Sequence, residues 1–185
     1  MSHFQDFEHE YGPPENCDNP SKGILETYQD LLPEDLLGQW RDLGMCSYRK
    51  GLLWFVDPGQ FSGILDDWIQ LPGPKPLVFL RSAFAHLYFW HDGWVHSLDV
   101  QHGSISQVTQ RISRMFTLLC DPEIQEKILR LSLFEKALQM LGPPERDECY
   151  AFEPALALGG PGTVETIRRV KMREHLAILA QLLHQ

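Results

Sequence analysis

The sequence predicts an α+β fold in which helices flank an antiparallel β-sheet and two lobes pack closely together. Three observations support this class: apolar residues recur at helical spacing towards both ends, short aromatic-rich stretches fill the middle, and Asp92-Gly93 is typical of a β-hairpin turn. With 185 residues, 43% of them hydrophobic, the chain can bury one substantial core or two small cores that share an interface. We expect helices and the antiparallel sheet in residues 1–100 and a mainly helical lobe in residues 101–185.

The amino-terminal segment predicts three helices. Residues 3–11 are short and amphipathic, Gly12-Pro13-Pro14 ends them, and residues 16–20 follow as a loop. Ser21 can cap a second helix that runs to about Leu31. A third helix begins at Pro33, whose missing N–H costs nothing there, and ends at Gly44; its apolar positions are Leu36, Leu37, Trp40 and Leu43.

The middle of the chain predicts short strands and one further helix. Residues 47–49 and 52–56 favour two short strands, or one strand after a tight turn. Asp57 as a cap and Pro58 in the first turn start a helix whose apolar stripe extends to Trp68. The proline-rich stretch that follows is a stiff connection, and an antiparallel sheet comes next, in the segments 77–83, 86–90 and, beyond the Asp92-Gly93 turn, 94–96.

Helical spacing returns in the carboxy-terminal part. It begins at Ser106, resumes at Asp121-Pro122 and again over residues 131–141. Residues 145–162 are too rich in Gly and Pro for long regular structure and predict a packed loop or a short strand. The remaining segments are residues 163–170, ambiguous between helix and strand, and residues 171–185, which predict a helix.

Charge is distributed unevenly along the chain. The formal net charge is −9, and residues 1–40 hold nine acids against Lys22 alone, giving −8. This asymmetry opposes direct binding to DNA or RNA, whose recognition requires clustered Lys and Arg, but it would speed the encounter with a basic protein such as a nuclease. The alternative is that the acidic surface only keeps the protein soluble. No apolar run is long enough for a membrane span, and residues 1–10 lack the pattern of a secretory signal, so we expect a soluble, cytoplasmic protein.

The cysteines and histidines predict neither a metal site nor a cofactor. Cys17, Cys46, Cys120 and Cys149 stand far apart without a Cys-x-x-Cys pair, and in the cytoplasm we expect them to be reduced. His86, His91 and His96 invite a zinc hypothesis. A two-residue turn at Asp92-Gly93 would, however, place His91 and His96 on one face of the sheet and His86 on the other, and we expect ordinary half-exposed histidines.

No catalytic constellation emerges either. A Gly-x-Ser-x-Gly elbow and a papain-like cysteine setting are both missing from the sequence, and Ser82 near His86 is the nearest candidate for a nucleophile. The neighbouring carboxylates Asp66-Asp67 and Asp147-Glu148 diverge by roughly 100° on a helix and favour solvated charge or contact with a basic partner. Among the tryptophans, Trp40, Trp54 and Trp68 lie on apolar stripes and predict core positions, whereas Trp94 follows the hairpin turn and could anchor an interface.

Several segments together resemble the bacterial GAD-like immunity proteins, in which a GAD-like domain runs into a smaller domain of unknown function. The segments that carry the resemblance, which covers nearly the whole chain, are Glu10–Pro14, Leu32–Trp40, Gly51–Pro58, Arg81–Phe84 and Leu141–Gly160. The resemblance implies an α+β fold, a GAD-like domain at residues 1–100, and a partner toxin, often a DNase, that a type VI secretion system injects into rival bacteria. It carries over no catalytic residues. One departure is Ala85-His86, where many relatives have Gly followed by an acid.

The sequence thus predicts a non-enzymatic immunity protein that binds and neutralises a toxin nuclease. The alternatives are an adaptor that binds a housekeeping protein and a nucleic-acid-associated domain. Exposed carboxylates and the hairpin turn are the expected contacts with the toxin; these residues are Asp57, Asp66, Asp67, His91, Asp92, Trp94, Glu145, Asp147 and Glu148.

Overall fold

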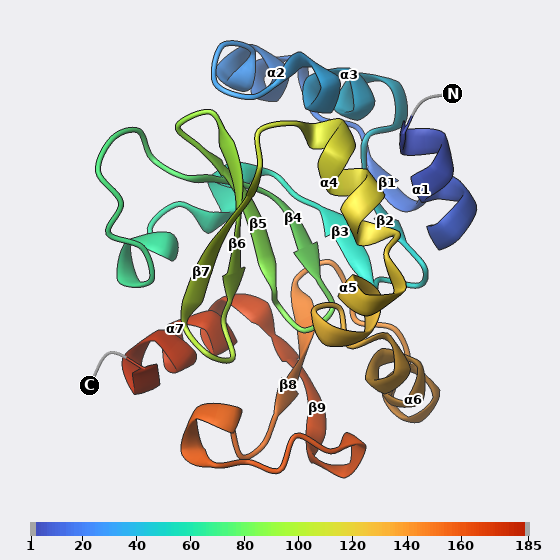
Figure 1. Ribbon diagram of the computed structural model, residues 1–185, viewed down its shortest axis with the longest axis vertical. Coiled ribbons are helices and arrows are strands. Elements are labelled where there is room, and N and C mark those ends of the chain that lie inside the picture. The colour runs from blue at the N-terminus through green and yellow to red at the C-terminus, as the bar shows by residue number, and fades with distance from the viewer. Residues whose placement is uncertain (1–2, 184–185) are drawn as a thin grey trace.

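Figure 1 shows the computed structural model, which describes residues 3–183. Its centre is an antiparallel sheet of seven strands that lie in the sheet in the order in which they occur along the chain. A second, two-stranded antiparallel sheet stands beside it. The α+β class is therefore confirmed. The strands are β1 (Glu15–Asp18), β2 (Met45–Tyr48), β3 (Leu53–Phe55), β4 (Leu77–Ser82), β5 (Leu87–His91), β6 (Trp94–Asp99) and β7 (Ser104–Thr109), with β8 (Glu148–Phe152) and β9 (Ile167–Lys171) in the small sheet.

Helices cover the large sheet, and three of them connect it along the chain to the small sheet (Figure 1). In chain order they are α1 (His3–Tyr11), α2 (Lys22–Tyr28), α3 (Glu34–Leu43), α4 (Ile112–Leu119), α5 (Pro122–Lys127), α6 (Leu131–Leu141) and α7 (Met172–Leu183). Single 3₁₀ turns occur at η1 (Pro58–Phe61), η2 (Leu65–Asp67), η3 (Leu156–Leu158) and η4 (Val164–Thr166). Within residues 3–183, no helix has the length and apolar character that crossing a membrane requires.

The helix boundaries follow the local signals in the sequence. The Ser21 hydroxyl accepts a hydrogen bond from the backbone N–H of Ile24, which caps α2 as expected. Gly44 ends α3 with a φ of 86°, a value that glycine adopts at no steric cost. The Asp121 carboxylate accepts from the N–H of Glu123 at 2.8 Å and starts α5. Helix α2 ends at Tyr28, earlier than predicted, and the last two residues of the predicted final helix lie outside the described residues.

The predicted hairpin is confirmed in its register. His91 pairs with Trp94 across the turn, and Asp92 and Gly93 have φ values of 46° and 78°, as a two-residue turn of positive φ requires. His91 and His96 consequently share one face, where their ring centroids lie 5.8 Å apart. His86 and His91 are, however, only 7% and 6% exposed, so the expectation that they are half-exposed is wrong.

Three predictions of local structure are wrong, two of them for the same reason. Residues 16–20, predicted as a loop, contribute to β1, and residues 104–109, which include the predicted start of a helix, form β7. These two strands are the edges of the large sheet, and most of their side chains face solvent, so they carry no apolar pattern that would identify them. The predicted helix after Asp57 consists of the separate turns η1 and η2, because Gly63 interrupts it with a φ of 82°.

The ambiguous carboxy-terminal segments form the small sheet. Residues 145–162 contain β8, one of the two structures predicted there, and residues 163–170 contain η4 and most of β9. The pairing joins Glu148 to Lys171 at one end and Phe152 to Ile167 at the other. These segments were ambiguous because β8 and β9 pair with each other across an intervening stretch of chain. The spacing of residues within each segment gives no information on that pairing.

Apolar side chains form two cores, one on each face of the large sheet. The first gathers Leu53, Phe55 and Leu80 from the sheet with side chains of α1, α3, α4 and α6. The second gathers Trp54, Val56, Val78 and Phe89 with η1, η2 and α7. The small sheet contributes to both, through Tyr150 and Phe152 to the first and Cys149 to the second. Trp40, Trp54 and Trp68 are buried as predicted, and Trp94 is half-buried.

A buried arginine joins the two sheets. Arg81 on β4 is fully buried, and its Nη2 donates to the carbonyl oxygens of Glu145 at 3.1 Å and Arg146 at 2.7 Å. Burial lowers the Arg81 pKa to about 10. The guanidinium groups of Arg81 and Arg146 lie 5.1 and 5.0 Å from the ring centroid of Trp54. Tyr150 N–H also donates to the carbonyl of Ala83, so both β8 and the segment that precedes it are anchored on the large sheet.

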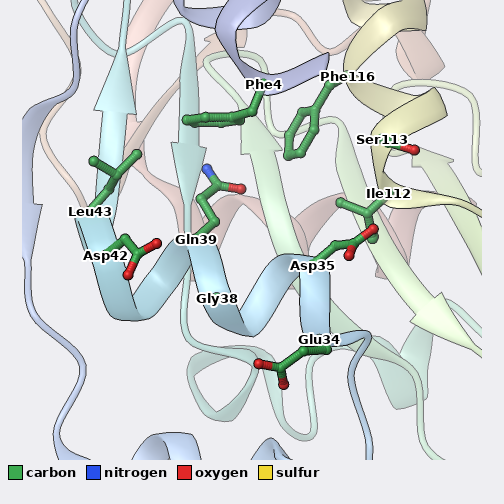
Figure 2. A pocket seen from close by; sticks show the side chains of 10 residues that line it. All are labelled: Phe4, Glu34, Asp35, Gly38, Gln39, Asp42, Leu43, Ile112, Ser113 and Phe116. Atoms are coloured by element: carbon green, nitrogen blue, oxygen red, sulfur yellow. The ribbon is translucent and has the colours of Figure 1, made fainter. Parts of the chain in front are cut away.

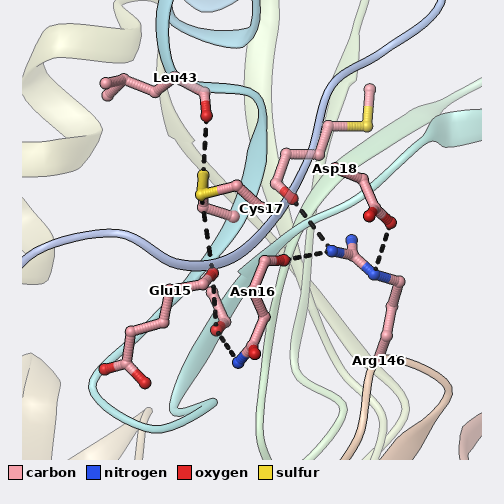
Figure 3. The surroundings of a disulfide bond; sticks show 9 residues. Glu15, Asn16, Cys17, Asp18, Leu43 and Arg146 are labelled. Carbon is pink, nitrogen blue, oxygen red and sulfur yellow. Dashed lines mark hydrogen bonds and ion pairs between the residues drawn. A yellow bond between two sulfur atoms is a disulfide. The ribbon is translucent and has the colours of Figure 1, made fainter.

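One disulfide corrects the expectation that all cysteines are reduced. Cys17 on β1 bonds to Cys46 on β2, whereas Cys120 and Cys149 are free. The two cysteines are separated by 29 residues and become neighbours only when the strands pair, so their spacing along the chain gave no signal. Figure 3 shows Arg146 beside this bond. The Arg146 Nε forms an ion pair with Asp18 at 3.0 Å, and the Arg146 Nη2 donates to the carbonyl of Met45. Arg146, just before the small sheet, therefore also holds the edge strand β1.

Candidate partner-binding surface

The three predicted carboxylates after β3 differ in their roles. Asp57 is half-buried; its Oδ1 accepts from Gly59 N–H at 2.8 Å and from the Tyr28 hydroxyl at 3.1 Å. Burial, followed by the charge of Asp57, raises the Tyr28 pKa to about 12. Asp57 thus caps η1 and ties it to α2, whereas Asp66 and Asp67 are exposed on η2 and available to a partner.

The hairpin residues offer little accessible polar surface. His91 is buried, Asp92 is exposed in the turn, and Trp94 is half-buried beside it. Desolvation lowers the His96 pKa, as does the neighbouring His91. His91 and Asp92 border a hollow of about 290 Å³ that also contains Lys75. A partner would therefore contact Asp92 and the edge of Trp94 rather than the His91 ring.

The acidic turn before β8 is largely neutralised from within. Asp147 forms an ion pair with Lys171 at 2.7 Å, and this hydrogen bond lowers the Asp147 pKa. Glu148 pairs with Arg169 at 3.3 Å and with Lys171 at 3.6 Å. Glu145 is exposed and, with Asp147, lines a cleft of about 550 Å³ next to Phe61 and Ile64 of the η1–η2 segment. Of the predicted contact residues, Glu145 and Asp147 line this cleft, and His91 and Asp92 border the hollow at the hairpin. The role of all the predicted residues as contacts stays a prediction.

The side chains considered for chemistry occupy structural positions. Ser82 is fully buried, and its hydroxyl accepts from the N–H groups of Phe84 and His86, which holds the turn between β4 and β5. His86 is buried against Tyr88, and burial lowers the His86 pKa to about 4. Across the described part of the chain, no three His, Cys, Asp or Glu side chains gather closely enough to hold a metal ion.

A groove between α1, α3 and α4 lies outside all of the predicted contact areas (Figure 2). It has a volume of about 650 Å³. Its residues are Phe4 of α1, the α3 residues Glu34, Asp35, Gly38, Gln39, Asp42 and Leu43, and the α4 residues Ile112, Ser113 and Phe116. Aromatic and aliphatic side chains form the floor and carboxylates form the rim, so the groove combines apolar and acidic character in one place.

The acids of this groove are spaced to share one face of α3. Asp35 and Asp42 are seven positions apart, two helical turns, and Gln39 lies between them at helical spacing. Both aspartates are exposed, and neither forms an ion pair within residues 3–183. Glu34 pairs with Arg41 at 3.0 Å, but both side chains are more than half exposed. The sequence does show this spacing, although only the fold reveals that α1 and α4 complete the groove.

Two family models match the chain and show which family it belongs to. Residues 2–103 match the family model "GAD-like domain", and the chain belongs to this family. Residues 109–183 match the family model "T6SS immunity protein Tdi1, C-terminal", so this part of the chain is similar to a type VI secretion immunity protein. The family predicted from the sequence is therefore confirmed. No curated protein gives a significant match.

A solved structure supports the fold. The crystal structure of Atu4351 from Agrobacterium tumefaciens superimposes with a TM-score of 0.77 over 96% of this chain and 88% of that chain. The two sequences are 20% identical, so this likeness concerns the fold alone.

Proposed function

We propose that this protein neutralises a nuclease toxin of a type VI secretion system by binding it in the cytoplasm and covering its active site or its DNA-binding surface. The match of residues 109–183 to an immunity protein supports the toxin-binding role. Neutralisation by binding requires no reacting group of the protein's own. The nuclease identity of the toxin rests on charge.

The single observation that carries the nuclease proposal is the excess of carboxylates that lack an internal counter-ion. Asp6, Glu8, Asp30, Asp35 and Asp42 form no ion pair within residues 3–183, and all lie in the first three helices or directly after them. A nuclease presents a basic groove to its own substrate, and an acidic surface would be drawn to it. The same surface would repel a phosphate backbone.

The size of the protein is compatible with strong inhibition. Protection from a nuclease requires about nanomolar binding, equivalent to about 12 kcal/mol. A standard interface of about 800 Å² on each partner can provide this affinity when a few anchors are well packed. The surface exposes 9339 Å² in total, so such an interface would cover only a small part of it.

A co-purification and a nuclease assay test this function. The toxin encoded beside this protein's gene, expressed as an inactive variant, is expected to co-purify with it. The active toxin is expected to degrade plasmid DNA alone but not with an equimolar amount of this protein. Degradation that continues in the presence of the protein contradicts the proposal. Submicromolar binding of the isolated protein to DNA or tRNA at physiological salt would support a nucleic-acid-associated role instead.

A further inference from the structure

We propose that the groove between α1, α3 and α4 receives a toxin segment that carries a lysine or arginine beside an apolar side chain. This inference rests on the proposed function and deepens it, because it names the docking surface and the chemistry of the segment that fills it. Three independent features of the groove support it: the apolar floor, the acidic rim and a buried amide without a partner.

The floor of the groove favours an apolar side chain. Phe4 and Phe116 contact each other edge to face, with ring centroids 5.2 Å apart, and Ile112 and Leu43 lie on either side. Phe4 and Leu43 are only partly buried, so apolar surface remains open to solvent in the groove. A partner side chain that covers this surface would remove it from water, which is the main driving force of association.

The rim of the groove favours a cation. Asp35 and Asp42 face solvent without an ion pair within the described chain, and no lysine or arginine lines the groove. Asp35 and Asp42 lie on one face of α3, two turns apart, with the apolar floor next to them (Figure 2). A lysine or arginine next to the inserted apolar side chain would meet these carboxylates. A nucleic acid would be repelled, and a second copy of this chain, with its own net charge of −9, would bring further negative charge.

The third feature of the groove is the buried side-chain amide of Gln39. Its side chain is 9% exposed, and neither amide atom has a hydrogen-bond partner in the described chain. Figure 2 shows the amide pointing into the groove below the ring of Phe4. The Tyr48 hydroxyl lies nearby. Burial and then the charge of Glu8 raise the Tyr48 pKa and the Gln39 amide lowers it, but the two side chains lack the geometry of a hydrogen bond.

An unpaired buried amide destabilises the free protein, and a leucine at this position would avoid that cost. Such local conflicts with folding are typical of binding sites. A partner group that moves the Phe4 ring aside would reach one donor and one acceptor at Gln39. The groove would then recognise the inserted segment through an apolar contact, an ion pair and a hydrogen bond.

The first experiment compares two charge reversals of equal size. The variant D35K/D42K changes the groove, and the control E165K/E174K makes the same change at two exposed acids that lie outside the groove and form no ion pair within the described chain. Binding of the inactive toxin from the neighbouring gene is measured by biolayer interferometry at low and high salt. We expect D35K/D42K to slow association about tenfold at low salt and the control to change it less than about threefold.

Wild-type-like binding of D35K/D42K, or an equal loss in both variants, would overturn the groove as the docking surface. The proposed function fails in a different way, since wild-type protein would then not bind the toxin or not protect DNA from it. A dimer of the free protein that D35K/D42K dissociates would show that the groove receives a second copy, which also overturns the proposal.

The second experiment removes the amide without changing the charge. For Gln39→Leu we expect an equal or higher midpoint of thermal unfolding, because an unpaired polar group is removed from the interior. We also expect the toxin complex to dissociate about tenfold faster with an unchanged association rate. If Gln39 serves only folding, the variant unfolds at a lower temperature and the dissociation rate stays the same, and the role of Gln39 in recognition is refuted.

Discussion

Arg81 on the large sheet holds the segment that precedes the small sheet. It carries a charge into the interior, where burial lowers its pKa, and two carbonyl oxygens of the segment before β8 accept its hydrogen bonds. Its guanidinium also lies against the Trp54 ring. Hydrogen bonds to a buried charge offset part of the cost of its burial, so these two carbonyls favour one position of the carboxy-terminal segment on the large sheet.

Replacement of this arginine should reduce stability strongly. In Arg81→Met, the carbonyls of Glu145 and Arg146 lose a buried donor, and we expect the free energy of unfolding to fall by about 2 kcal/mol or more. The matched control is Arg41→Met, which breaks an exposed ion pair with Glu34 and should cost less than about 1 kcal/mol. Urea unfolding followed by tryptophan fluorescence measures both. Equal losses in the two variants would show that Arg81 does not join the sheets.

Two buried histidines make stability depend on pH. Burial lowers the pKa of His175 to about 4, and burial also lowers that of His86 to about 4, against an ordinary value of 6.5. At a pH between about 4 and about 6.5, these two histidines bind protons in the unfolded chain but not in the folded chain. The free energy of unfolding therefore falls as the pH falls from about 6.5 to about 4, by at most about 1.4 kcal/mol per pH unit for each histidine.

Urea midpoints at pH 7.5 and pH 5 measure this dependence. We expect a lower midpoint at pH 5, and a smaller decrease in His175→Leu, which removes one of the two titrating groups. His175 suits this test because its Nε2 has no hydrogen-bond partner in the described chain, so leucine leaves no donor or acceptor unpaired. An unchanged pH dependence in the variant would mean that His175 is not a source of it.

Among the elements, the β5–β6 hairpin depends most on its turn residues. Gly93 has a φ of 78°, and an added Cβ would contact nothing within 4 Å, so any cost of substitution comes from the backbone conformation alone. We expect Gly93→Ala to destabilise the protein by about 1 kcal/mol. Gly23→Ala, in the exposed first turns of α2, should instead stabilise it by up to about 1 kcal/mol. The midpoint of thermal unfolding should be lower in Gly93→Ala and higher in Gly23→Ala than in the wild type. Midpoints that shift in the same direction would contradict this interpretation.

The elements show which parts of the fold the sequence could predict. The hairpin and the bounds of α1 and α6 follow from turn residues and apolar spacing, which are local signals. The edge strands β1 and β7 could not be predicted, because exposed strands carry polar residues and their partners lie elsewhere in the chain. The disulfide between Cys17 and Cys46 depends on the same strand pairing and was missed with it.

The candidate site was predictable only in part for a similar reason. Net charge indicated an acidic surface, and the spacing of Asp35 and Asp42 on α3 is visible in the sequence. The acids chosen from the sequence instead included Asp147 and Glu148, which the fold pairs with Lys171 and Arg169. Which carboxylates remain unpaired depends on contacts between distant segments, and local spacing contains no record of them.

For the whole molecule, both cores depend on the carboxy-terminal part of the chain. Phe116, Phe134 and Tyr150 complete the core on one face of the large sheet, while Leu176 and Leu179 complete the core on the other. The family model for the amino-terminal part ends at residue 103, before β7 and before all of these side chains. The two matched regions thus share their hydrophobic interior, and neither face of the large sheet is closed without the second region.

We therefore expect the full chain to unfold in one cooperative transition and its amino-terminal region not to fold alone. In urea, tryptophan fluorescence, which reports on Trp40, Trp54 and Trp68 in both cores, should change at the same concentration as far-ultraviolet circular dichroism. A fragment of residues 1–110, which retains β7 but lacks the carboxy-terminal side chains, should bind a hydrophobic dye and show no cooperative transition, because large apolar areas of the sheet stay exposed. The length of the fragment removes the objection that a missing edge strand causes the defect. Separate transitions in the full chain, or a cooperatively folded fragment, would show that the two regions are independent domains and that Arg81 joins them without making them one folding unit.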